Sequence, residues 1–255
     1  MQFLTHRQSV ILNRTVDAHI ESAQPVGSRL LTEAYDMDFS PATIRTEMGH
    51  LEEFGYLAQP HVSSGRIPTD SGYRYYLDHA ILKNLPAGGT QEAEMPPGLK
   101  TEREDLADIV VQRLSACVRE AGVVLLVETL PSGTKRHRLF LQGSAYLLEK
   151  PEFQDVQRLR PVLAAFEEKN RLIDALLAQG AAADIQVCVG QENGLENFHE
   201  CSVVSGRCLN AETFTGLVAV IGPRRMPYSK IIAKVRQMTV LMNEFFENEE
   251  IDFHE

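Results

Sequence analysis

A proline- and glycine-rich stretch divides the chain at residues 84–100, where the sequence is NLPAGGTQEAEMPPGLK. Three prolines and three glycines lie within these 17 residues, and no apolar position recurs with a regular period. Proline and glycine interrupt regular elements, so such a stretch is typical of a linker. The sequence therefore predicts two domains, residues 1–83 and residues 101–255, each long enough to bury its own core.

The segment before the linker begins with the signals of two helices. Thr5 can cap the first helix, with Gln8 as the second member of a capping box. Apolar residues then recur at four-residue steps, as in a buried helical stripe, at Leu12, Val16 and Ile20. Pro25 and Gly27 end this helix, and a short second helix is expected over residues 28–35.

A third helix and a hairpin complete the pattern. Ser40 and Pro41 suit the cap and the first turn of the third helix, and Gly55 suits its end. The inward face of this helix is expected to hold Ile44, Met48 and Leu51. Residues 56–69 predict an edge hairpin, and residues 70–82 predict a fourth helix. Three helices followed by a hairpin indicate a winged helix-turn-helix.

The third helix of such a domain enters the major groove of DNA. Most side chains on the outward face of this helix are short. Arg45 is the one long hydrogen-bond donor there, and its guanidinium suits a bidentate contact with guanine. The predicted DNA-binding positions on this helix are Ser40, Ala42, Thr43, Arg45, Thr46, Gly49 and His50. Ser64 and Arg66 are predicted to lie at the hairpin tip, where Arg66 would contact phosphate or the minor groove.

Two other interpretations of these residues stay open at this point. Arg45 could pair with acidic neighbours on a solvated helix face, and winged helices also serve as protein-interaction modules. The net charge of −10 excludes a broad attractive field for DNA. Residues 1–83 alone hold seven basic and ten acidic side chains. DNA binding must therefore depend on a few placed arginines and backbone amides.

The segment after the linker has an α+β pattern. The expected helices span residues 103–120, 161–178 and 229–248, with Pro161 opening the second. The expected strands span residues 123–128, 136–142, 184–190, 201–205 and 216–222. Two apolar stripes could form a dimer seam, although each is more typical of a helix packed on its own sheet. They comprise Leu163, Phe166, Asn170, Ile173 and Leu177, and Ile231, Val235, Met238, Met242 and Phe245.

Features of catalytic or ligand sites are weak. His199 and Cys201 could form a base and nucleophile, but a structural histidine and a buried cysteine are favoured. Arg224 and Arg225 could hold an anion, but solvated loop arginines are favoured. No C-x-x-C pair or glycine-rich phosphate loop occurs in the sequence. The four cysteines are expected to pack as small apolar side chains. We expect no enzyme activity, no cofactor and no metal site. Because no signal peptide or membrane-spanning run is visible, we expect a cytoplasmic protein.

Distinctive strings run along the chain, nearly continuously over the first 80 residues and in blocks afterwards. The N-terminal strings are LTHRQSVIL, QPVGSRLL, SPATIRTEMGHLEEFGYLAQPH and SSGRIPTDSGYRYYLDH. The later blocks are GSAYLLEKPEF, VGQEN, CSVV and GLVAVIGPRRMPY. In these strings the chain resembles the heat-inducible transcription repressor HrcA family.

The resemblance implies a dimeric repressor of chaperone operons. Such proteins bind an inverted-repeat operator called CIRCE, and a GroEL-type chaperonin keeps them active. It also implies a GAF-like C-terminal domain with a role in dimerisation. The stretch between the fourth helix and GSAYLLEKPEF is shorter than the family pattern, so part of that domain, or a dimerisation segment inserted in it, is expected to be missing. Pro227 stands where the pattern has an acidic residue. The alternatives are a repressor that senses a small ligand and an adaptor that binds protein.

Overall fold

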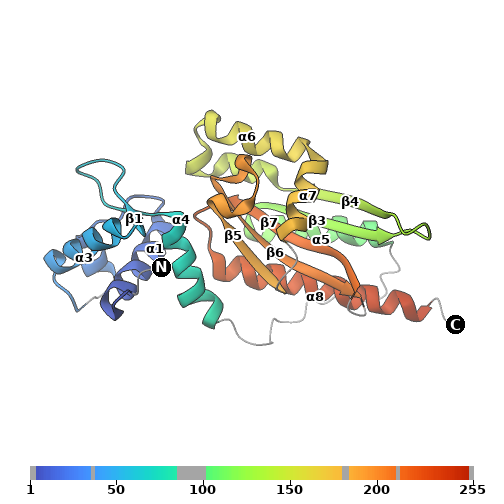
Figure 1. Cartoon of the computed structure of the whole chain (residues 1–255), viewed down its shortest axis with the longest axis horizontal. Helices are drawn as coiled ribbons and strands as arrows, with labels where there is room; N and C mark the ends of the chain where they lie inside the picture. Colours follow the sequence, from blue (N-terminus) through green and yellow to red (C-terminus); the bar gives the residue numbers. More distant parts are fainter. Residues whose placement is uncertain (1–3, 36–37, 85–101, 180–183, 211–212, 253–255) are drawn as a thin grey trace. The chain divides into compact units, whose positions relative to one another are not determined.

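The computed structural model describes residues 4–35, 38–84, 102–179, 184–210 and 213–252. The chain forms two compact units, Met1–Leu85 and Pro86–Glu255 (Figure 1). The predicted linker, apart from Asn84, falls outside the described residues. We describe each unit separately.

The first unit is a winged helix-turn-helix, as the sequence predicts. Its helices are α1 (His6–Ser22), α2 (Ser28–Ala34), α3 (Pro41–Glu53) and α4 (Asp70–Tyr76). Strand β1 (Leu57–Ala58) pairs antiparallel with β2 (Ile67–Pro68), and these two short strands form the base of the wing. The core of the unit includes the fully buried Ile11, Leu12, Val16, Val26, Leu31, Ile44, Leu51 and Leu77.

Local sequence signals set the ends of these helices. Thr5 and Gln8 form the predicted capping box at the start of α1, which satisfies backbone N–H groups that have no partner within the helix. Ser40 caps α3, and Pro41 occupies its first turn. Gly55 has a φ of +79° just after α3, a backbone conformation that glycine adopts without steric cost. The predicted caps are therefore confirmed.

The second unit is built on a five-stranded antiparallel sheet with the order β4-β3-β7-β6-β5. Its strands are β3 (Ala121–Thr129), β4 (Lys135–Gln142), β5 (Ile185–Val189), β6 (Cys201–Asn210) and β7 (Thr213–Pro223). Counted along this unit, the order is 2-1-5-4-3. The first strand, β3, therefore lies inside the sheet between β4 and the last strand, β7.

Helices cover both faces of this sheet. On one face, α5 (Arg103–Val118) packs on β3 and β4, and α8 (Tyr228–Asp252) packs on β6 and β7 (Figure 1). On the other, α6 (Val156–Glu167) and α7 (Lys169–Gln179) share an apolar core with β3, β6 and β7. A sheet covered on both faces explains the nearly continuous apolar run of β3. The α+β prediction for this unit is confirmed.

Two details differ from the sequence-based expectation. Asp155 caps α6, and Pro161 lies inside that helix rather than at its start. The chain then leaves helical geometry at Glu168, so α6 and α7 are separate helices. The stripe from Leu163 to Leu177 is therefore not one continuous seam, and Asn170 is exposed on α7. The stripe of α8 is buried within its own unit, as the packing interpretation predicts.

Candidate nucleic-acid interface

Helix α3 buries one face and presents the other to solvent. Its buried face holds Ile44, Met48 and Leu51, each at most 1% exposed. The opposite face carries the predicted DNA-binding residues. Ser40, Ala42, Arg45, Thr46 and His50 are exposed, and Thr43 and Gly49 are half-buried. The helical period alone therefore brings these seven predicted positions onto one accessible surface.

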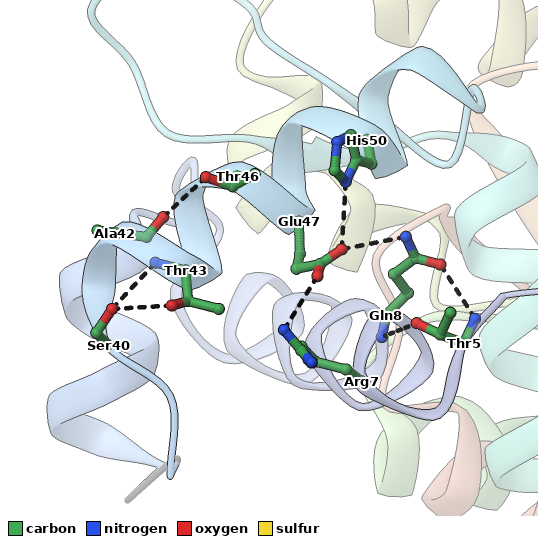
Figure 2. Close-up of polar contacts among 9 residues, drawn as sticks. All are labelled: Thr5, Arg7, Gln8, Ser40, Ala42, Thr43, Thr46, Glu47 and His50. Atoms are coloured by element: carbon green, nitrogen blue, oxygen red, sulfur yellow. Dashed lines mark hydrogen bonds and ion pairs between the residues drawn. The ribbon is translucent and has the colours of Figure 1, made fainter.

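Hydroxyl groups at the start of α3 are held by local hydrogen bonds (Figure 2). Ser40 Oγ accepts a hydrogen bond of 3.2 Å from the Thr43 N–H and lies 3.0 Å from Thr43 Oγ1. Thr46 Oγ1 donates to the carbonyl oxygen of Ala42 at 3.1 Å. Because a hydroxyl has only one hydrogen, Thr46 offers its methyl group rather than a donor to a partner outside the helix.

Glu47 joins α3 to the start of α1 (Figure 2). Its carboxylate accepts a hydrogen bond of 3.1 Å from Gln8 Nε2 and lies 3.5 Å from Arg7 NH1. His50 Nδ1 lies 3.3 Å from the same carboxylate. An isolated carboxylate beside this surface would repel phosphate. These three partners instead fix its position, and the cationic Arg7 offsets its charge.

Arg45 makes no ion pair within the described part of the chain, although it is exposed on α3. Its side chain lines a groove of about 390 Å³ between α3 and the wing. The wing side of this groove is lined by Gln59, Val62, Ser63, Ser64, Gly65 and Arg66. The interpretation in which Arg45 pairs with acidic neighbours on the helix is therefore wrong. Arg45 therefore lines this groove with no carboxylate paired to it among the described residues.

The tip of the wing is organised by its own side chains. Ser64 Oγ accepts a hydrogen bond of 3.0 Å from the His61 N–H and lies 2.7 Å from the His61 carbonyl oxygen. Gln59 Nε2 donates to the carbonyl oxygens of Val62 and Ser64 at 3.1 and 3.0 Å. Val62 is 98% exposed. The hydroxyl of Ser64 thus holds the turn, and Val62 projects furthest into solvent.

Arg66 does not lie at the tip, in contrast to the expectation from sequence. It comes immediately before β2, and its backbone pairs with Val26 in an isolated antiparallel bridge. Its guanidinium contacts Glu52 through Nε and NH2, each 2.9 Å from Oε2. The side chain of Arg66 is only 16% exposed. Glu52, near the end of α3, therefore accepts the hydrogen bonds that Arg66 was predicted to donate to a DNA phosphate.

The weaker candidates lie in the second unit. Burial raises the pKa of the Cys201 thiol well above its ordinary range, which disfavours the thiolate that a nucleophile needs. Arg224 lies 2.8 Å from Glu200, and Arg225 lies 2.5 Å from Glu152. The two arginines are therefore partners of carboxylates rather than solvated loop residues. Of the four cysteines, Cys117 is exposed and the other three are buried.

A buried carboxylate lies close to these ion pairs. The side chain of Glu120 is 1% exposed and contacts Lys150 Nζ through Oε1. Its other oxygen, Oε2, is buried and has no hydrogen-bond partner among the described residues. Burial raises the pKa of Glu120 from 4.5 to about 7, although Lys150 opposes the shift. Sequence reasoning missed this group, because nothing in the residues around position 120 indicates its burial.

No helix in the described ranges is long and apolar enough to cross a bilayer. The solved structures include a match over 96% of this chain and 99% of the other, with a TM-score of 0.80 and 20% sequence identity. That structure is described as a hypothetical protein at 2.2 Å resolution, so the likeness concerns the fold alone.

Comparisons with known sequences assign the family. The heat-inducible transcription repressor HrcA of Shouchella clausii is 29% identical, with 92% of this chain and 96% of that protein covered. HrcA of Syntrophobacter fumaroxidans is 28% identical, with 97% and 99% covered. The first alignment runs over 330 residues, more than the 255 of this chain, which confirms that the chain is shorter than its relative. A profile described as "HrcA protein C terminal domain" matches residues 87–232, more than half of the sequence. The chain belongs to the HrcA family.

Proposed function

We propose that this protein is a DNA-binding transcription repressor of heat-shock chaperone operons. The observation that carries the proposal is Arg45, an uncommitted arginine on the outward face of a capped α3 beside a wing. The repressor names of the relatives at 28–29% identity give independent support. A protein with this function works in the compartment that holds the DNA, the bacterial cytoplasm.

The proposed DNA contacts follow from what each side chain has to offer. Arg45 reads a guanine through paired N–H donors. Ser40 and Thr43, at the start of the helix, contact phosphate. Thr46 packs its methyl group against a base, while Ala42 and Gly49 allow the backbone to approach closely. His50 adds a polar contact at the far end of the surface, and Ser64 keeps the wing in shape.

The proposed operator is an inverted repeat bound by a homodimer. One winged helix with so few free cations has little electrostatic affinity for DNA. Two copies related by a two-fold axis contact two half-sites at once, and the local concentration of the second copy raises the affinity. A GroEL-type chaperonin is the proposed modulator, supplying the folded, binding-competent repressor.

The test of this function is selection of bound fragments from the genome of the host organism by the purified full chain. The proposal expects enrichment of an inverted repeat upstream of chaperone genes. A salt titration on the selected duplex then measures how many counterions are released. If no selected duplex binds more tightly than a random fragment at low salt, sequence-specific DNA binding is contradicted.

A second candidate is a repressor that senses a small ligand. It is favoured by a groove of about 470 Å³ between α7, β5 and residues 192–195 in the second unit. Gln186 Oε1, in that groove, is buried without a hydrogen-bond partner among the described residues. Operator release caused by a small-molecule extract of the host, after removal of protein, would support this candidate over chaperonin control.

A further inference from the structure

Arg66 connects three parts of the first unit that lie far apart in the sequence. Its backbone N–H donates to the carbonyl oxygen of Val26, and the Val26 N–H donates back, both at 2.9 Å. Val26 lies in the turn between α1 and α2 and is fully buried. The guanidinium of Arg66 contacts Glu52, in the last turn of α3. One residue at the base of the wing therefore joins the α1–α2 turn to the recognition helix.

The base of the wing leaves little freedom for another arrangement. A Cβ atom on Gly65 would lie 2.4 Å from the Val26 carbonyl carbon and oxygen, so only glycine permits this approach. At the other end of β2, Thr69 Oγ1 donates to the carbonyl oxygen of Gly55 at 2.6 Å. Hydrogen bonds to the α1–α2 turn and to Gly55, just after α3, thus hold both ends of β2. The Glu52–Arg66 pair adds a side-chain link between α3 itself and the wing.

We propose that Arg66 is a positioning residue, which sets the angle between α3 and the wing through Glu52 so that both elements fit one duplex. This inference rests on the proposed DNA-binding function. The pair places two donors on a single carboxylate oxygen, and both side chains are mostly screened from solvent, Arg66 at 16% and Glu52 at 35% exposure. Charge-assisted hydrogen bonds in this setting are strong enough to fix an angle between elements.

The alternative is that Arg66 contacts a phosphate and that Glu52 merely occupies it in the absence of DNA. The two roles predict opposite signs for one substitution. If Arg66 contacts phosphate, Glu52→Ala frees the guanidinium and removes a negative charge, so operator binding becomes tighter. If Arg66 positions the wing, Glu52→Ala loosens the angle and operator binding becomes weaker, although the chain has become less acidic.

Glu53 provides a matched control. It is the next residue of α3, it is exposed, and it makes no ion pair in the described part of the chain. Glu53→Ala therefore removes the same charge from the same helix turn without touching the wing. Affinities of the full-length parent and variants are measured for the operator and for a random duplex over a series of salt concentrations. Circular dichroism checks that each variant is folded.

The positioning role predicts that Glu52→Ala binds the operator about tenfold more weakly, while Glu53→Ala binds it as well as the parent or better. Arg66→Ala should show the same loss with an unchanged salt slope, because no phosphate contact is removed. The double variant should be no weaker than either single variant, since both remove the same link. Glu52→Gln, which keeps the volume of the side chain, gives the same direction if Glu52→Ala does not fold.

Three results would overturn the inference: tighter operator binding by Glu52→Ala, additive losses in the double variant, or a salt slope lowered by about one in Arg66→Ala. A parent chain that binds no duplex at all would instead refute the proposed function. The two failures are therefore distinguishable in the same series of measurements.

Discussion

The side-chain amide of Gln8 donates a hydrogen bond of 3.1 Å to the carboxylate of Glu47, across 39 positions of sequence. The other end of the same amide, Oε1, accepts a hydrogen bond of 3.0 Å from the Thr5 N–H. One side chain thus completes the cap of α1 and fastens α1 to α3. The orientation of the recognition helix depends on how α1 begins.

Gln8→Ala should therefore destabilise the first unit by about 1–2 kcal/mol, because it removes both the capping interaction and the link to α3. Urea unfolding followed by circular dichroism measures the change. Gln24→Ala is the control, because Gln24 is an exposed glutamine in the turn after α1. Equal stabilities of the two variants would show that the amide of Gln8 contributes nothing beyond its volume.

Arg45→Ala should weaken operator binding by about 1–3 kcal/mol and relax the preference at one base position, since a bidentate contact with guanine is lost. Binding to a set of operators substituted at single positions provides the measurement. Arg171→Ala, which removes an exposed arginine from α7, should leave both affinity and preference unchanged. A uniform loss on all sequences would make Arg45 a phosphate contact.

Glu120 should make the protein less stable as the pH rises from about 4.5 to about 7. The folded state holds the proton up to a pKa of about 7, whereas the unfolded chain releases it near 4.5. The folded state therefore binds more protons in this window, and stability falls with increasing pH. Above pH 7 this contribution is constant.

Glu120→Gln removes that dependence, so the stability advantage of the parent over the variant should shrink by up to about 3 kcal/mol between pH 5 and pH 7.5. Unfolding free energies of both proteins across this range provide the measurement. Glu149→Gln, at an exposed carboxylate beside Lys150, should follow the parent. A difference between parent and Glu120→Gln that is constant with pH would contradict the assignment.

The full chain should sediment as a dimer at micromolar concentration, because an inverted repeat is matched by two-fold symmetry. Sedimentation velocity across a dilution series gives the mass of the species. The complex with one operator duplex should contain two chains. A monomer that binds one half-site with the full operator affinity would contradict this prediction.

Chaperonin should increase the fraction of active repressor without changing its intrinsic dissociation constant for the operator. If only a fraction of the protein is competent, the apparent affinity falls by that fraction. The protein is refolded with and without a GroEL-type chaperonin and ATP. Stoichiometric titration with operator then gives the active fraction, and a titration at low protein concentration gives the intrinsic dissociation constant. Full activity without chaperonin, retained after mild heating, would contradict this form of control.

Features that depend on neighbouring residues in sequence were predictable here. The caps at Thr5 and Ser40 and the buried face of α3 follow from residues within one or two helical turns. The contacts of Glu47 with Gln8 and of Glu52 with Arg66 were not predictable, because tertiary packing brings together side chains that the sequence separates. Arg66 looked free for DNA because its partner lies on another element.

The start of α6 was predicted wrongly for a related reason. Proline is most common in the first turn of a helix, so Pro161 suggested a helix start. In the structure, Asp155 caps the helix six residues earlier, and its side chain accepts a hydrogen bond of 2.9 Å from the Gln157 N–H. A short polar residue before an apolar run was the better signal.

The position of β3 between β4 and β7 has a consequence for synthesis on the ribosome. Hairpin β3–β4 is complete at Gln142, but the strand that must pair with the other edge of β3 begins only at Thr213. Until β7 emerges, the apolar faces and one open edge of this hairpin have no partner in the growing chain. The sheet of the second unit can therefore close only after the last of its five strands has been synthesised.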